Sequence, residues 1–186
     1  MLIKFKKIIF LFLFIFNFNL FAHTTNSIYN LNIELTDNYD KKILFSDLNG
    51  KVCILAMIYT HCKTICPIII SNMKSIEKLF TLDELNNINF VLITLDPDRD
   101  NIALLNKFYI DKNLNKNWCL LKTSKINTLK LSHILGIKYK KDSTGDYVHS
   151  YLILIIDKFG IIQMYHQGLD KDYSNLLYLV KNLIQN

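Results

Sequence analysis

The sequence predicts an α/β fold, a mixed central sheet flanked by helices on both faces. Continuous apolar runs at residues 52–59 (VCILAMIY) and 88–95 (INFVLITL) are typical of strands buried on both faces. Segments with helical spacing of apolar residues alternate with these runs, as expected when helices connect the strands of one sheet. A chain of 186 residues is long enough for one such domain.

The N-terminal segment, residues 1–22, has the layout of an export signal. Three lysines precede a nine-residue apolar run at 8–16, and Ala22 is a small residue at a plausible cleavage point. The run is short for a membrane span, but a loosely apolar stretch continues to Phe21, so a retained membrane anchor is the alternative. We therefore expect an exported, periplasmic protein, released or anchored to the inner membrane, with its domain at 27–186.

The charge of the exported part is modest. The formal net charge is +6, but the first 22 residues hold three lysines and no acid, which leaves 19 basic and 16 acidic residues, or +3. No Lys/Arg cluster is interleaved with aromatic residues, and Lys140 and Lys141 read as a solvated turn. We therefore expect no nucleic-acid partner.

The first half of the domain begins with two short extended pieces, 27–35 and 41–51, around a polar turn. The buried strand at 52–59 follows. Pro67 suits the first turn of a helix, where its missing N–H costs nothing. Apolar residues then recur at roughly helical spacing, namely Ile68, Met73, Ile76, Leu79 and Phe80.

The middle of the domain continues the alternation. The strand at 88–95 ends at the acidic segment DPDRD, and 101–113 has a helical pattern with Asp100 as a candidate N-cap. A short strand at 117–121 precedes a helix at 124–136, which should begin at a serine cap and stop at a glycine.

The end of the chain predicts an antiparallel hairpin of residues 149–157 and 161–167 around the turn KFG, followed by a helix from residue 170. A mixed sheet that ends in a hairpin and a helix is the thioredoxin arrangement. We therefore expect a thioredoxin-like fold with an N-terminal extension. Cys62 and Cys66 then lie at the carboxyl end of the first central strand, where open α/β sheets place their sites.

Four cysteines allow several interpretations. In an oxidising compartment two structural disulfides are the simplest, but Cys53 and Cys119 lie in apolar runs, where free cysteine packs as a small buried hydrophobe. Cys62 and Cys66 instead lie at an element boundary, and their i, i+4 spacing places both sulfurs on one helix face. A helix N-terminus lowers the pKa of a thiol. Thiolate serves both disulfide exchange and soft-metal binding, so the motif alone permits either role.

The three-residue spacer between the cysteines separates the two sulfurs more widely than the two-residue spacer that is usual in redox pairs, and this separation suits two sulfurs that face one ion. Two thiolates are too few for a structural zinc site, but they suit Cu(I) if one imidazole arrives from elsewhere. His149 is the best placed, because it precedes a central strand at the position that faces the cysteine loop and usually carries a cis-proline in thioredoxin arrangements. His23 lies at the expected processing site, and His61 should point away from the thiols. His133 and His166 are expected in structural or solvated positions.

Three segments in the same order resemble the SCO/SenC family of copper-binding cytochrome oxidase assembly proteins, over a stretch from about residue 33 to the C-terminus. The segments are DLNGKVCILAMIYTHCKTICP, LITLDPDRDNIALLNKFY and YVHSYLILIIDKFG. They match the cysteine, acidic-arginine and distal-histidine motifs of the family at Cys62, Cys66 and Pro67, at 96–100, and at His149, Ser150 and Asp157.

The resemblance implies a thioredoxin-like domain that binds one copper through Cys62, Cys66 and His149. It also implies delivery of copper to the copper-bearing subunit of cytochrome c oxidase, or maintenance of that enzyme's cysteines in reduced form, with a thioredoxin-type thiol reductant as a further partner. This favours a metallochaperone over an enzyme. The alternative is a periplasmic thiol-disulfide oxidoreductase that uses a Cys62–Cys66 disulfide bond.

Three positions depart from the family pattern. Lys63 and Thr64 stand where proline and aspartate are common, and Val148 stands where an acid often precedes the histidine. The loss of those acids removes partners that would orient the ligands, whereas the charge of Lys63 favours thiolate. These changes bear on metal affinity and partner choice rather than on the ligand set.

The acids of DPDRD are a further candidate for weak metal binding. Carboxylates are poor ligands for Cu(I). We therefore favour a structural interpretation for Asp96 and Asp98, in which the segment forms a turn, caps the next helix and supplies an ion pair to Arg99.

Overall fold

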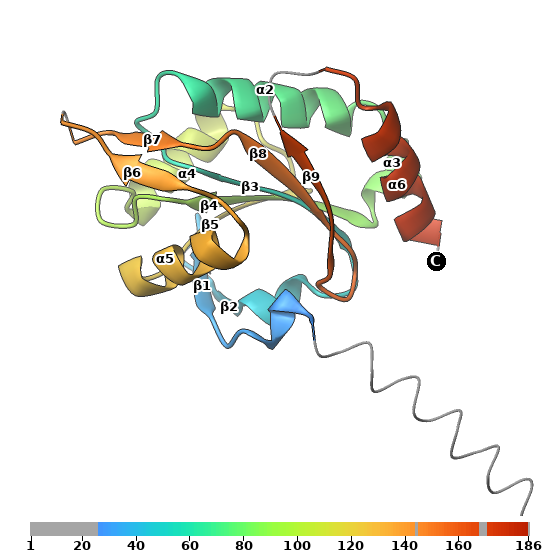
Figure 1. The fold of residues 1–186 in the computed structure, drawn as a ribbon, viewed down its shortest axis with the longest axis horizontal. Helices are drawn as coiled ribbons and strands as arrows, with labels where there is room; N and C mark the ends of the chain where they lie inside the picture. Colours follow the sequence, from blue (N-terminus) through green and yellow to red (C-terminus); the bar gives the residue numbers. More distant parts are fainter. Residues whose placement is uncertain (1–25, 144, 168–170, 186) are drawn as a thin grey trace, which may run out of the picture.

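The computed structural model describes residues 26–143, 145–167 and 171–185 (Figure 1). The expected export segment at 1–22 and His23 lie outside this part of the chain. Among the described residues, none of the helices combines the length and the apolar character needed to cross a membrane.

Seven strands form one mixed sheet in the order β2-β1-β5-β4-β3-β8-β9. Strands β3, β4 and β5 are parallel to one another, and the other neighbouring strands pair antiparallel. This architecture confirms the predicted α/β, thioredoxin-like fold with its terminal hairpin. The strands are β1 (Glu34–Asp37), β2 (Lys42–Leu44), β3 (Val52–Ile58), β4 (Ile88–Thr94), β5 (Trp118–Lys122), β8 (Leu152–Ile156) and β9 (Ile162–Gln167).

Helices cover both faces of the sheet (Figure 1). One hydrophobic cluster lies between the sheet and α2, α4 and α6, and a second lies between the opposite face and α5 with the N-terminal segment. Side chains of β3 alternate between the two clusters, with Ile54 in the first and Leu55 in the second. The helices are α2 (Ile65–Glu77), α3 (Leu82–Leu85), α4 (Ile102–Asp111), α5 (Lys125–Ile134) and α6 (Ser174–Gln185), with 3₁₀ helices η1 (Ile28–Asn30) and η2 (Phe45–Leu48).

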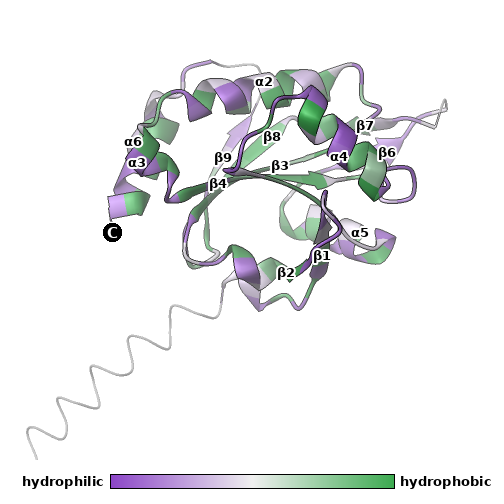
Figure 2. Ribbon diagram, turned by 180° about the vertical axis from the view of Figure 1, so that it is seen from behind, coloured by the Kyte–Doolittle hydropathy of each residue, from purple (hydrophilic) through white to green (hydrophobic). Residues whose placement is uncertain are grey.

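The burial of both faces explains why the central strands read as unbroken apolar runs. Every residue of β3 is buried, and β4 is buried at all but one position. Figure 2 shows the hydrophobic colouring concentrated in this central layer. Cys53 packs inside the second cluster as expected, and Cys119 packs half-buried against it. All four cysteines are free thiols.

Local capping agrees with the sequence at one helix and differs at another. Ser124 caps α5 by accepting a hydrogen bond from Asn127 N, and Gly136 follows the helix at a φ of +67°. The predicted cap of α4 was wrong. The side chain of Asn101 accepts the hydrogen bond from Leu104 N (2.9 Å), while the Asp100 carboxylate is buried and turned towards the sheet.

A second sheet of two short strands was not predicted. β6 (Tyr139–Lys141) and β7 (Tyr147–His149) pair antiparallel and are separate from the seven-stranded sheet. Lys140 and Lys141 are exposed, as a solvated turn would leave them, but they lie in β6. Strands of three residues give no periodic signal long enough to identify them.

The described chain enters the domain at the turn between β8 and β9. Ile28 N donates a hydrogen bond to Gly160 O (2.9 Å), and a side chain at Gly160 would meet Ser27 Oγ at 2.5 Å. Because Ile156 at the end of β8 lies opposite Cys53, this turn is beside the start of β3. Cys62 follows the other end of that strand.

Candidate metal centre

The cysteine half of the site is built at the junction of β3 and α2. Cys62 lies in the connecting loop, and Cys66 lies in the first turn of α2 with Pro67 next to it. The backbone N–H of Cys66 donates a hydrogen bond to Cys62 Sγ (3.3 Å). The sulfur thus accepts from one of the N–H groups that a helix leaves unpaired at its start.

The two thiols differ in acidity although both are buried. Burial raises the pKa of Cys66 far above its ordinary value, and the adjacent Cys62 sulfur raises it further. Burial also raises the pKa of Cys62, but hydrogen bonds from Cys66 and Thr64 outweigh that effect and hold this pKa below its ordinary value. Cys62 is therefore the more acidic thiol, and Cys66 is the one that keeps its proton.

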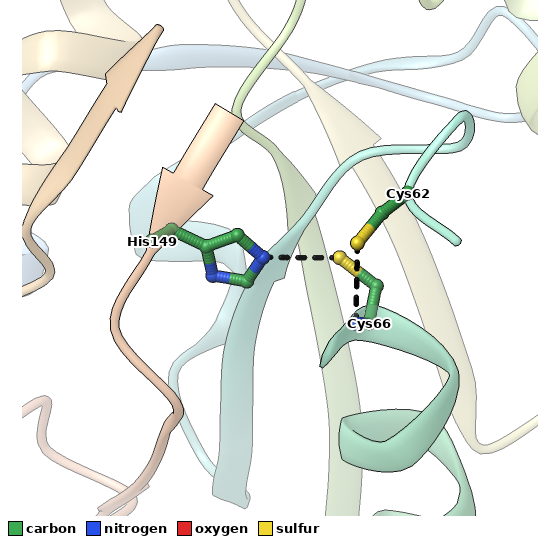
Figure 3. Close-up of side chains that lie close together, drawn as sticks. All are labelled: Cys62, Cys66 and His149. Atoms are coloured by element: carbon green, nitrogen blue, oxygen red, sulfur yellow. Dashed lines mark hydrogen bonds between the residues drawn. The ribbon is translucent and has the colours of Figure 1, made fainter. Parts of the chain in front are cut away.

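The histidine half of the site comes from the separate β6–β7 hairpin. His149 ends β7, and its ring points at the two sulfurs (Figure 3). Its Nδ1 lies 3.1 Å from the carbonyl oxygen of Ser150. Since a carbonyl only accepts, Nδ1 carries the proton and Nε2 presents its lone pair. Burial lowers the pKa of His149, which favours this neutral form.

The lone pair of His149 meets the thiol of Cys66. Nε2 lies 3.1 Å from Cys66 Sγ, so the S–H of Cys66 donates to the imidazole. A metal ion bound by both atoms would take the place of that proton. No cis peptide bond occurs among the described residues, so a histidine after a trans bond occupies the position where a cis-proline is usual.

Cys62, Cys66 and His149 together form a cluster in which all ligand atoms lie within 4.8 Å of one another. Two sulfurs and one imidazole nitrogen make a soft donor set. A hollow of about 380 Å³ borders the cluster and opens it to the surface between the cysteine loop and the hairpin; its lining includes Lys63, Thr64, Tyr147, Val148 and His149. The site is thus buried at its ligand atoms and accessible from one side.

The remaining described histidines lie outside this cluster, as expected. His61 is half-exposed, and its Nδ1 faces Thr60 Oγ1 (3.1 Å) and Asp100 Oδ1 (3.6 Å). His133 is exposed on α5, and His166 in β9 contacts the ring of Tyr173.

The DPDRD segment forms the ion pair that the sequence indicated but does not cap the next helix, a role that Asn101 takes. Arg99 forms an ion pair with Asp96, and Asp98 lies 3.5 Å from Lys125. Neither carboxylate belongs to the ligand cluster. Arg99 also reaches the hairpin, where its guanidinium nitrogens lie 3.4 Å from Asp146 Oδ1.

Asp100 is the functional residue that sequence reasoning misassigned. Its carboxylate is fully buried and accepts hydrogen bonds from Thr60 N (3.1 Å), Thr60 Oγ1 (2.5 Å) and Thr94 Oγ1. It therefore fixes the start of the loop that carries Cys62. The sequence offers one hint, because the acid is followed directly by an asparagine, which caps a helix equally well.

The departures from the family pattern lie around the ligands. Thr64 Oγ1 lies 3.8 Å from Cys62 Sγ, so a hydroxyl stands beside the sulfur. Lys63 is exposed, Val148 is 67% exposed, and both line the hollow. The two positions where the family often has an acid are therefore not acidic here, whereas Asp142 and Asp146 of the hairpin line the same hollow.

The fold and the site define the class of this protein. It is a thioredoxin-like protein in which two thiols and one imidazole converge at the end of a central strand. Within that class, the chain belongs to the SCO1/SenC family, whose model matches residues 22–184. The match confirms the resemblance seen in the three motifs.

Individual relatives are distant in sequence and close in fold. The SCO1 protein homolog of Bacillus subtilis is 24% identical over 147 residues, which cover 76% of each chain. The mitochondrial SCO2 homolog of Danio rerio is 24% identical over 145 residues, which cover 74% of this chain and 51% of that one. A SCO1/SenC family lipoprotein from Bacillus anthracis superposes with a TM-score of 0.73 at 26% identity, covering 82% of this chain and 96% of that one. Arabidopsis thaliana ScoI, solved with copper bound, superposes with a TM-score of 0.69 at 19% identity, covering 83% of this chain and 97% of that one.

Proposed function

We propose that this protein binds one Cu(I) ion as cargo through Cys62, Cys66 and His149 and delivers it to the copper-bearing subunit of cytochrome c oxidase. The observation that carries the proposal is the convergence of these three ligand atoms within 4.8 Å. The soft donor set favours Cu(I), which accepts three ligands, over zinc, which takes four in structural sites.

Two further facts support the proposal. The ScoI proteins of Arabidopsis thaliana and Bradyrhizobium japonicum were solved with copper bound, and the similar protein BsSco is described as a member of the Sco family of cytochrome c oxidase assembly proteins. In this chain, both thiols and the imidazole are at most 9% exposed, so water has little access to the ligand atoms.

The same proposal gives the protein a location and a second partner. We place it in the periplasm, released or held at the inner membrane by the N-terminal segment; its Bacillus anthracis relative is described as a lipoprotein. Copper loading requires both thiols in reduced form, so a thioredoxin-type thiol reductant would act before loading.

The decisive experiment loads the reduced chain with Cu(I) without oxygen and measures the bound metal. We expect one Cu(I) per chain, weaker binding by His149→Ala, and unchanged binding by the exposed control His133→Ala. Mixing the loaded chain with the copper-bearing subunit should transfer the ion. Absence of bound Cu(I), or equal binding by His149→Ala, would refute the ligand assignment, and retention of copper in the mixture would refute delivery.

A second candidate function is disulfide reduction, which the unequal acidity of the two thiols favours. The Cys62 thiolate would attack a partner disulfide, form a mixed disulfide and release one partner thiolate. Cys66, after losing its proton, would attack Cys62 Sγ and release the second partner thiol, leaving a Cys62–Cys66 disulfide and a partner reduced by two electrons. This activity should be lost in Cys62→Ser and kept in His149→Ala, whereas copper binding should suffer in both.

A further inference from the structure

The hairpin that carries His149 has no ladder of hydrogen bonds to the main sheet. β6 and β7 form their own sheet, and each strand has three residues. A hairpin of this size has little stability of its own. Only Ser150 and Tyr151 join His149 to β8 of the main sheet. The distance between His149 and the cysteines therefore depends on this connection and on side chains that hold the hairpin against the cysteine loop.

Tyr59 is the first of these side chains. It follows β3 and stands three residues before Cys62. Its hydroxyl donates to Tyr147 O (3.1 Å) and accepts from Tyr147 N (3.4 Å). The hairpin's ladder is formed from the neighbouring residues, with hydrogen bonds from Asp142 N to Asp146 O and from Ser150 N to Lys138 O. The backbone of Tyr147 accordingly faces away from β6, and the tyrosine hydroxyl takes the place of a neighbouring strand.

The ring of Tyr59 supports the same part of the hairpin. It packs edge-on against the ring of Tyr147, with centroids 5.5 Å apart, and against the ring of His149 at 6.0 Å. Tyr59 is 3% exposed, so these contacts are buried. One side chain thus fixes both the backbone before His149 and the face of its imidazole.

Arg99 is the second side chain. Its guanidinium pairs with the buried Asp96 on its own loop, lies 3.4 Å from Asp146 Oδ1 on the hairpin, and stands 6.0 Å from the centre of the Tyr147 ring. The neighbouring Asp100 holds Thr60 in the cysteine loop. A single loop after β4 therefore contacts both halves of the metal centre.

We propose that Tyr59 and Arg99 are positioning residues that hold the β6–β7 hairpin so that His149 Nε2 faces the two thiols. Neither residue belongs to the ligand cluster. Arg99 acts through Asp146 and Tyr147, and Tyr59 acts through Tyr147 and His149 and also meets the Cys62 thiol with its hydroxyl. The copper readout of this proposal rests on the proposed function, whereas the position of the hairpin is a property of the metal-free protein. Without these contacts, His149 moves away from the sulfurs and Cu(I) retains two ligands.

Two conservative variants remove one contact each in the full chain. Tyr59→Phe deletes the hydroxyl and keeps the ring, and Asp146→Asn weakens the hairpin's ion pair while Arg99 keeps its buried partner Asp96. Tyr109→Phe is a matched control because it removes a tyrosine hydroxyl that donates to Asn115 O (2.6 Å) beside α4. Asp111→Asn is the control for charge, since it removes the ion pair with Lys107 (2.6 Å).

The first measurement is amide hydrogen exchange of the metal-free protein. The amides of β6 and β7 should exchange about fivefold faster in Tyr59→Phe and Asp146→Asn, the factor that corresponds to one ordinary net hydrogen bond. Exchange in α2 should not change, and the controls should match the wild type throughout. Equal acceleration across the whole domain, or none in the hairpin, would overturn the proposal.

The second measurement is a double-mutant cycle on Cu(I) affinity. Each variant should weaken binding about fivefold in the wild-type background. In the His149→Ala background Asp146→Asn should leave binding unchanged, because it displaces only the histidine, whereas Tyr59→Phe should keep a smaller part of its loss, because its hydroxyl also meets Cys62. An equal loss in both backgrounds would show a general structural effect and overturn the proposal. If the wild type binds no Cu(I), the proposed function fails, and the exchange experiment still decides the role of Tyr59 and Arg99.

Discussion

The two halves of the metal centre are built in different ways. The cysteine half follows a fully buried strand that is hydrogen-bonded to neighbours on both sides, and its two cysteines are four residues apart, Cys62 in the connecting loop and Cys66 in the first turn of α2. The histidine half lies 83 residues beyond Cys66 on a three-residue strand outside the main sheet. Backbone structure therefore preorganises the sulfurs, while side-chain contacts place the imidazole. We expect His149 to cost less to displace than either cysteine, which is compatible with the proposed release of copper.

The largest expected effect tests the cysteine half. Cys66→Ser removes one of two soft ligands. Loss of a residue that only hydrogen-bonds a metal ligand lowers metal affinity by up to ~100-fold, so loss of the ligand itself should lower the Cu(I) affinity by more than that. His149→Ala keeps both sulfurs and should cost less. The half-buried Cys119→Ser is the control. Competition with a Cu(I) chelator measures all three, and a greater loss in His149→Ala than in Cys66→Ser would reverse the comparison.

The next largest effect is on the free energy of unfolding, when the carboxylates that hold the cysteine loop and the hairpin are changed. Asp100→Ala leaves Thr60 N–H without its buried acceptor and should lower the free energy of unfolding by about 1–3 kcal/mol. Asp146→Asn breaks a half-exposed ion pair on the hairpin and should change that free energy by less than about 1 kcal/mol. Urea unfolding of the metal-free chain compares them. Equal losses would mean that the hairpin is as much a part of the cooperative core as the cysteine loop.

A smaller effect should appear in the pH dependence of copper binding. The raised pKa of Cys66 means that its proton must leave when the metal binds, so affinity should rise with pH by about tenfold per unit for each proton released near neutrality. The lowered pKa of His149 leaves the imidazole already neutral there, so it adds no proton. Affinity should be measured from about pH 6, near the ordinary pKa of histidine, to about pH 8. The slope of log affinity against pH should be the same for the wild type and for His149→Ala. A slope lost with His149 would contradict this assignment.

The smallest expected effect concerns a family departure within the cysteine half. Burial raises the pKa of Cys62, and the Thr64 hydroxyl is the weakest of the contacts that together lower it. Thr64→Ala should therefore raise this pKa slightly and leave the hairpin unaffected. The pH profile of iodoacetamide labelling at Cys62 measures the change. A downward shift would show that the hydroxyl does not stabilise the thiolate.

The sequence predicted most of the cysteine half because its determinants are local. The buried strand and the proline in the first helical turn follow from short-range rules. The prediction that both sulfurs share one helix face was wrong, because Cys62 precedes the helix and its sulfur accepts a hydrogen bond from Cys66 N–H at the helix start. The histidine was predicted from its place before a central strand together with the family motif. The structure brings it to the sulfurs, at 3.1 Å from Cys66 Sγ.

The contacts that hold the histidine could not be predicted in the same way. β6 and β7 are too short for a periodic pattern, and the partner of Arg99 on the hairpin lies 47 residues away. Asp100 resembles a helix cap in sequence, and only its burial shows that it serves the cysteine loop. Pairings of this kind depend on tertiary packing, which short-range patterns do not encode.

The described chain enters the domain beside the β8–β9 turn. This entry point determines how the domain would be oriented relative to an attachment at its N-terminus. Ile28 is fastened near the start of β3, and the sulfurs lie beyond the far end of that strand, about 20 Å away for seven residues. A tether before residue 26 would therefore hold the domain by its base. Cys62, Cys66 and His149 would then lie at the end of the domain opposite the attachment.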